Sequence, residues 1–174
     1  MPVVEACSLP DDALLQSYVE QQAYTDCYRI DIAREIELPR YVSAFYTTPV
    51  FRLERLILKL LFARPSSDAQ AESLARAASQ EFAAWFAEAR NSNQLLMCDF
   101  HGRTRSWFMV EPLTAGRSRL YFGSAITPVA HSGSGRPGIG PGFKLLLGFH
   151  RLYSRILLRA AAARLRAEIV VDSA

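Results

Sequence analysis

Cysteine and histidine are scarce in this sequence of 174 residues, and their scarcity excludes several classes of protein. The three cysteines, Cys7, Cys27 and Cys98, lie far apart, and the sequence holds no C-x-x-C motif and no Cys/His cluster. A disulfide-built secreted domain or a zinc site needs cysteines in pairs or clusters. We therefore expect reduced thiols, no metal site and no cofactor.

Long apolar runs and a strong net charge are also lacking. No run reaches the roughly 18 uninterrupted apolar residues that a membrane-spanning helix needs. The first residues, "MPVVEACSLPDD", have no basic segment followed by an apolar one, as a signal peptide would. The net charge of +3 is too small to indicate a nucleic-acid partner. We expect a cytoplasmic protein of ordinary globular composition, long enough to bury a core.

The apolar patterning predicts one domain over residues 23–168, with an N-terminal arm or short helix over 1–22 and a tail over 169–174. The segment "AYTDCYRIDI" alternates between apolar and polar residues, as a strand does. The segment "ELPRYVSAFYTTPVFRLERLILKLLFARP" predicts two helices that are separated at Pro49, because proline breaks or restarts a helix. Ser67 and Gln70 have the spacing of a capping box, which predicts a further helix after them.

From Glu81 onward the period of the pattern changes to two. Four apolar-rich runs, "EFAAWFAEAR", "NQLLMCDF", "RTRSWFMVEPL" and "RSRLYFGSAIT", are separated by the turn sequences "NS", "HG" and "TAG". Such spacing predicts an antiparallel meander. The longest helix follows, over residues 143 to about 166. The fold class is therefore α+β: an antiparallel sheet wrapped around a long C-terminal helix, with short helices after the first strand.

A literal G-x-G-x-x-G, at Gly133, Gly135 and Gly138, lies between the last strand and this helix. A dinucleotide-binding loop places these glycines in the first turn of a parallel β-α-β unit, and a Walker A loop continues as G-K-[ST]. Here the glycines follow a meander, Pro137 interrupts the motif, and the continuation "PGFKLLL" does not fit. We interpret residues 131–142 as a flexible loop that could act as a lid.

The order of these elements resembles the START/Bet v 1-like (SRPBCC) helix-grip superfamily. The stretches "GRTRSWFMVEPLTAGRSRLYFGSAITPV" and "GFKLLLGFHRLYSRILL" are similar to those of bacterial members, and the resemblance covers roughly residues 24–165. It implies a curved sheet of up to seven strands around the C-terminal helix, with a hydrophobic cavity between them. Our count is about five strands, so either the fold is abbreviated or a strand lies in the N-terminal arm. Members bind lipids, sterols, polyketides or aromatic molecules, and some catalyse cyclisation or proton transfer.

Residues on the apolar face of the long helix and on one face of the meander are the candidate site. His150 shares the helix face with Tyr153, where it could orient a ligand, act as a general base, or simply be paired within the core. If the arginine-bearing faces of the strands point outward, small hydroxyls and aromatics point inward; these could line a pocket or fill a core. The predicted ligand-binding residues are His150, Tyr153, Ser106, Phe108, Phe122, Ser124 and Cys98, with His150 as the candidate catalytic residue.

The expected function is binding of a hydrophobic or aromatic small molecule, lipid-like or polyketide-like, in an internal cavity. One alternative is an enzyme of the cyclase/aromatase or hydrolase type that uses His150 as general base. Another is a non-catalytic module that binds a protein partner, or transiently a membrane surface, through the amphipathic helix at residues 50–64, whose basic stripe is Arg52, Arg55 and Lys59. Asp26 and Asp99 are possible acid or base groups, but the sequence shows no partner for either, so we expect them to be solvated at strand edges. The sequence does not specify an oligomeric state.

Overall fold

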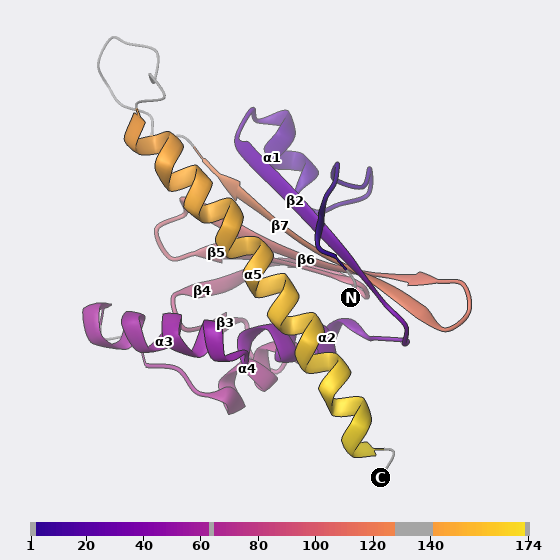
Figure 1. The fold of residues 1–174 in the computed structure, drawn as a ribbon. Coiled ribbons are helices and arrows are strands. Elements are labelled where there is room, and N and C mark those ends of the chain that lie inside the picture. Colours follow the sequence, from indigo (N-terminus) through magenta and orange to yellow (C-terminus); the bar gives the residue numbers. More distant parts are fainter. Residues whose placement is uncertain (1–2, 63–64, 128–140, 173–174) are drawn as a thin grey trace.

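The computed structural model describes residues 3–62, 65–127 and 141–172. It has the α+β class that the sequence predicts: an open, curved, antiparallel sheet of seven strands, crossed by a long C-terminal helix (Figure 1). The expected Gly/Pro loop falls on residues 128–140, which lie outside the described residues. Residues 141 and 142, which we expected in that loop, belong to the first turn of the C-terminal helix.

The elements follow one another in the order that the sequence predicts. The strands are β1 (Glu5–Ala6), β2 (Tyr24–Ile32), β3 (Glu81–Phe82), β4 (Trp85–Arg90), β5 (Gln94–Asp99), β6 (Thr104–Leu113) and β7 (Arg117–Ile126). The helices of the described residues are α1 (Gln16–Glu20), α2 (Leu38–Tyr46), α3 (Pro49–Phe62), α4 (Asp68–Ala75) and α5 (Pro141–Asp172). Across the sheet the strands lie in the order β1-β2-β7-β6-β5-β4-β3.

Two short strands account for the difference from our count of five. One is β1 in the N-terminal arm, which pairs with β2 and extends the sheet at that edge. The other arises because the run "EFAAWFAEAR" is not one strand. It folds back at Ala83, whose φ of 54° is positive, so that β3 pairs with β4 as a tight hairpin. Residues with a side chain adopt this backbone conformation infrequently, and the alternating pattern gave no indication of it.

One face of the sheet packs against α2, α4 and α5 and forms the larger core. Phe45 of α2 is central to it, since its ring lies 4.8 Å from the ring of Phe108 and 4.8 Å from that of Phe122. Tyr41 of the same helix is fully buried and donates a hydrogen bond from its hydroxyl to the backbone oxygen of Tyr121, at 3.0 Å. Aromatic side chains therefore fill the space between the sheet and the helices at this level.

The opposite face of the sheet is covered by the N-terminal arm, which builds a second core around Leu15, Tyr18 and Trp107. Gln94 ties the arm to the sheet: its Oε1 accepts from the Leu14 N–H and from the Trp107 indole N–H, both at 2.9 Å. The face on which Trp107 lies, next to arginines, was expected to be exposed. It is instead buried, because the arm is an integral layer of the domain and not a loose extension.

Proline and capping residues set the helix boundaries as the sequence predicts. Pro39 lies in the first turn of α2 and Pro49 begins α3. Ser67 and Gln70 make both hydrogen bonds of a capping box at the start of α4. Among the helices of the described residues, none combines the length and the apolar character needed to cross a bilayer.

Two glycines allow a direct test of this packing. A Cβ atom on Gly123 would lie 2.9 Å from the Asp26 backbone oxygen and 3.0 Å from the Trp107 ring, whereas one on Gly148, in the exposed part of α5, would meet nothing within 4 Å. Gly123→Ala should therefore lower the free energy of unfolding by about 2 kcal/mol. Gly148→Ala should raise it by about 0.5–1 kcal/mol, because alanine favours the helix. Urea unfolding of both variants measures this, and equal effects would contradict the arm packing.

Candidate functional site

A serine, a carboxylate and a histidine meet where α5 crosses β2 and β7. Asp26 and Ser124 lie directly opposite one another in the paired strands, so their side chains share the face that α5 covers. The Ser124 hydroxyl donates to Asp26 Oδ1 and lies 2.6 Å from His150 Nε2. His150 Nε2 is also 3.9 Å from Asp26 Oδ2. Ser124 and His150, both predicted site residues, are thus brought together, while Asp26 is buried in the cluster and not solvated as we expected.

The direction of these hydrogen bonds limits the chemistry of the cluster. A carboxylate only accepts, and a serine hydroxyl has one hydrogen, so a Ser124 that donates to Asp26 must accept from Nε2–H of His150. In a Ser-His-Asp triad the carboxylate instead orients Nδ1, and Nε2 takes the serine proton. Ser124 is only 2 % exposed. The arrangement is therefore a buried hydrogen-bonded group and not a serine nucleophile with its base.

A tyrosine and an arginine extend this cluster to the surface. Tyr24 donates from its hydroxyl to Asp26 Oδ2 at 3.2 Å, and the Arg151 Nε donates to the Tyr24 oxygen at 2.8 Å. Burial raises the pKa of Tyr24, which keeps this hydroxyl protonated as a donor. The Asp26 carboxylate is therefore surrounded by two hydroxyls and an imidazole, with its side chain 8 % exposed.

Tyr153, one turn along α5 from His150, has a different partner. Its hydroxyl donates to Glu54 Oε2 of α3 and so joins the two helices. Burial raises the pKa of the Glu54 carboxyl, and the hydrogen bond from Tyr153 opposes that rise. On the other side, the Phe149 ring stacks on Tyr153 with 6.0 Å between centroids. Sequence reasoning did not single out Glu54, although it is the single acidic residue in α3.

The predicted sheet residues divide into two groups. Ser106 faces Ser124 across the β6–β7 pair, and Phe108 faces Phe122, so all four share the face that α5 covers, as we predicted. The two phenylalanines are buried in the aromatic core, whereas Ser106 is half-buried beside the cluster. The expected pocket wall is therefore packed in its middle and polar at one end.

Cys98 does not belong to this set, and its predicted position is wrong. Its partner across the β5–β6 pair is Arg105, and this places it on the opposite face of the sheet from Ser106. The reason is that β5 is buried on both faces, so its run "LLMCD" does not alternate. Without alternation the sequence cannot specify which residues of the strand point toward α5.

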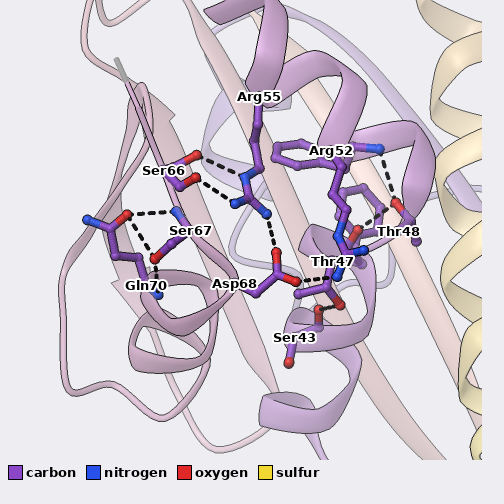
Figure 2. A network of polar contacts seen from close by, with 11 residues as sticks. Ser43, Thr47, Thr48, Arg52, Arg55, Ser66, Ser67, Asp68 and Gln70 are labelled. Atoms are coloured by element: carbon purple, nitrogen blue, oxygen red, sulfur yellow. Dashed lines mark hydrogen bonds and ion pairs between the residues drawn. The ribbon is translucent and has the colours of Figure 1, made fainter. Parts of the chain in front are cut away.

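The expected basic stripe on α3 is also corrected, as Figure 2 shows. The Arg55 guanidinium is buried: it donates to Asp68 Oδ1 at 2.6 Å, to the Ser66 backbone oxygen at 2.6 Å and to Ser66 Oγ at 3.0 Å. Arg52 also pairs with Asp68, whose pKa is lowered first by the hydrogen bond from Arg55. The two arginines fasten α3 to the start of α4. The side chain of Lys59 lies outside the described residues.

The outward side of α3 is instead apolar. Its exposed side chains recur at a spacing of three or four residues and so form one stripe along the helix. They are Leu53, Leu56, Ile57 and Leu60. The neighbouring α5 also exposes apolar side chains on its outer face, which are Phe149, Leu152 and Ile156. We call these seven residues the outer apolar surface.

The Glu54–Tyr153 pair predicts a pH dependence of stability. Because the folded state raises the pKa of Glu54, it binds more protons than the unfolded chain from about pH 4 upward, and stability falls as pH rises through the raised pKa. Glu54→Gln should remove this component. Urea unfolding between pH 4 and 8 should therefore show the wild type losing stability relative to Glu54→Gln as pH rises. Glu20→Gln, at an exposed site, is the control; curves that run parallel for wild type and Glu54→Gln would refute the assignment.

Known proteins do not identify this site. The described residues hold no group of three or more His, Cys, Asp or Glu side chains arranged to bind a metal ion. Comparison of the chain with protein-family models, with curated proteins and with solved structures gave no match. The helix-grip superfamily therefore stays a resemblance in the order of elements, and the function has to be argued from the geometry of the cluster.

Proposed function

We propose that the protein binds a small molecule with an apolar or aromatic body and a hydrogen-bonding group, at the end of the helix–sheet space where Asp26, Ser124 and His150 meet. The observation that carries this proposal is the nearly buried Asp26 carboxylate, whose partners are two hydroxyls and an imidazole. Burying a carboxylate is costly unless strong partners compensate. Burying this carboxylate between a helix and a sheet costs free energy that a purely structural role does not explain. Ligand binding would explain why the cluster is there.

The surroundings of the cluster match such a ligand. His150 and Ser106 are both half-buried, so neither is closed off from solvent. The ring of Tyr153, half-buried against the core one turn along α5 from His150, offers an apolar wall. A few polar groups beside an apolar wall are what small-molecule sites use to orient a ligand.

Binding is better supported than hydrolysis. A hydrolase built on Ser124 would need an accessible hydroxyl whose proton passes to histidine, whereas this hydroxyl is buried and directed at Asp26. The packed aromatic rings of Phe45, Phe108 and Phe122 also confine a ligand to the polar end. We therefore place the ligand toward the N-terminal half of α5 and not in the centre of the domain.

The test is native mass spectrometry of the protein purified from cells, followed by thermal-shift titration with the extracted compound. A stoichiometric apolar adduct is expected. His150→Ala should weaken its binding roughly tenfold, the loss of about one good hydrogen bond. His101→Ala is the matched control, because His101 is exposed in the turn between β5 and β6. A protein free of adduct that also shows no thermal shift with fatty acids, sterols and phenols would refute the proposal.

A second candidate function is supported by a separate observation, the outer apolar surface of α3 and α5. Leu60 is 73 % exposed and Leu152 is 58 % exposed. Soluble proteins seldom leave such stripes uncovered on neighbouring helices. Beside Leu152 on α5 lie the exposed Arg151, Arg155 and Arg159. An apolar helix face flanked by arginines matches the surface of an anionic bilayer, which accepts the apolar side chains and attracts the cations.

Sedimentation with liposomes tests this membrane contact. The protein should bind vesicles of phosphatidylglycerol and phosphatidylcholine, and bind pure phosphatidylcholine much more weakly. Leu152→Glu should reduce binding roughly tenfold or more, given the transfer free energy of one leucine. The control is Val19→Glu, since Val19 is similarly exposed but lies on α1, on the opposite side of the sheet. A dimer in solution that Leu152→Glu dissociates, without vesicle binding by the wild type, would assign the surface to self-association instead.

A further inference from the structure

The structure brings together two cysteines that are 20 residues apart in the sequence. Cys7 follows β1 and Cys27 lies in β2, and their sulfur atoms share a hydrogen bond with 3.4 Å between them. The Cys7 N–H also donates to the Cys27 backbone oxygen at 3.0 Å, which continues the β1–β2 ladder by one residue. The two side chains are therefore held opposite one another on adjacent antiparallel strands.

This placement allows a disulfide with little movement. Residues directly opposite in an antiparallel hydrogen-bonded pair have Cα atoms about 5.5 Å apart. Bridged cysteines have Cα separations of roughly 4.4–6.8 Å, so the backbone spacing already fits. A small change in the side-chain torsions would bring the sulfur atoms into bonding contact. The third cysteine, Cys98, is buried in β5, which lies three strands from β2 across the sheet.

The surroundings of the pair give its two thiols different roles. Cys7 is half-buried, and its pKa is lowered by the hydrogen bond with Cys27 and by the positive charges of Arg29 and Arg119. Cys27 is buried, and its hydrogen bond with Cys7 and its burial raise its pKa. The thiolate is the nucleophilic form of cysteine. Cys7 is thus the attacking sulfur, and Cys27 is the partner that resolves the product.

A surface depression lies near the pair, at the next residues on the same face of β1 and β2. Arg29 and Arg119, which act on Cys7, also line a surface depression of about 160 Å³ together with Glu5 and Asp31. Asp31 accepts from Arg119 at 2.7 Å, which holds the guanidinium beside the depression. Hydrogen peroxide is small enough to enter such a space, and cationic surroundings favour the thiolate that reacts with it.

We propose that Cys7 and Cys27 form a redox-active pair that a hydroperoxide converts into a disulfide, tying the N-terminal arm to β2. The Cys7 thiolate attacks one peroxide oxygen, the O–O bond breaks, and the products are a sulfenic acid on Cys7 and hydroxide. The Cys27 thiol then attacks the Cys7 sulfur, an S–S bond forms, and water leaves with the thiol proton. In total, two thiols and one H₂O₂ give one disulfide and two waters.

The consequence is a covalent bond that holds the N-terminal arm on the face of the sheet opposite α5. The arm contributes Leu15 and Tyr18 to the second core, and in the reduced protein it is held there by non-covalent contacts. A bond between Cys7 and Cys27 closes a loop of about 20 residues, which restricts the unfolded chain. Oxidation should therefore raise the midpoint of thermal unfolding by about 6 °C or more and slow proteolysis of the arm.

The experiment is peroxide titration of the reduced protein, followed by intact mass, thiol labelling and peptide mapping. The expected product has lost about 2 Da, the mass of two hydrogens, retains a single labelled thiol at Cys98, and yields a Cys7–Cys27 peptide. Cys98→Ser should react in the same way as the wild type. Dimedone should trap a sulfenic acid on Cys7 in Cys27→Ser, and none on Cys27 in Cys7→Ser.

Other products of the same titration would overturn the proposal. They are a disulfide between two chains, oxidation of Cys98 before the pair, and sulfinic acid on Cys7 while the Cys27 thiol stays reduced. The Cys27→Ser variant keeps the readout valid if the disulfide itself disturbs folding, because sulfenic acid formation on Cys7 does not need Cys27. If Cys7 in that variant is no more reactive toward peroxide than Cys98, the assignment of the attacking sulfur is wrong.

Discussion

The pairing of β2 with β7 is the constraint on which the rest of the structure depends. It joins a strand that precedes α2, α3 and α4 in the chain to the last strand of the meander, along the whole length of β2. Closing so long a stretch of chain has an entropic cost, and the cost is recovered because both faces of the resulting sheet are buried. The same pairing puts Asp26 opposite Ser124, and it puts Cys27 opposite Gly123 on the other face. The cluster of Asp26, Ser124 and His150 depends on this register, since a slip by one residue would exchange the faces of β2, whereas the Cys7–Cys27 pair depends on the register of β1 with β2.

The burial of both sheet faces also decides what could be predicted from the sequence. Turn residues such as Gly102 and Gly116, at positive φ, delimit the strands whatever covers them, so the meander and the long helix were predicted correctly. The face of the sheet toward which each side chain points was harder to predict. Where one face carries hydroxyls and aromatics and the other carries arginines, as in β6, the alternation separated the two faces correctly, although the arginine-bearing face is buried by the arm; where both are apolar, as around Cys98, it failed. Asp26 and Arg55 were placed in solvent because the sequence does not show the distant partners that allow a charge to be buried.

The two halves of α5 have different surroundings and therefore different roles. Its C-terminal half presents small and branched residues to the core, among them Leu157, Leu158, Ala161 and Leu165, all nearly inaccessible. Alanines let the helix approach the aromatic residues of α2, so that this end is closed packing. Around His150 and Tyr153 the helix instead carries polar groups inward and leaves Phe149 and Leu152 uncovered. A helix that served only to cover a hydrophobic core would present apolar side chains to it along its whole length. The difference between the two halves therefore distinguishes the proposed site from the packed part of the domain.

Asp26 and Cys27 are neighbours in β2 whose side chains point to opposite faces, so the polar cluster and the thiol pair share one peptide segment. This segment has little freedom to adjust independently. The Asp26 backbone oxygen lies against Gly123, at a distance that would not admit a Cβ atom, and Leu15 of the arm packs at the same point. A displacement of the backbone at Cys27 would therefore also displace the Asp26 carboxylate that accepts from Ser124. The thiol pair and the proposed ligand site therefore both require the backbone of β2 to keep its place, which fits a disulfide that forms by side-chain rotation with little backbone movement.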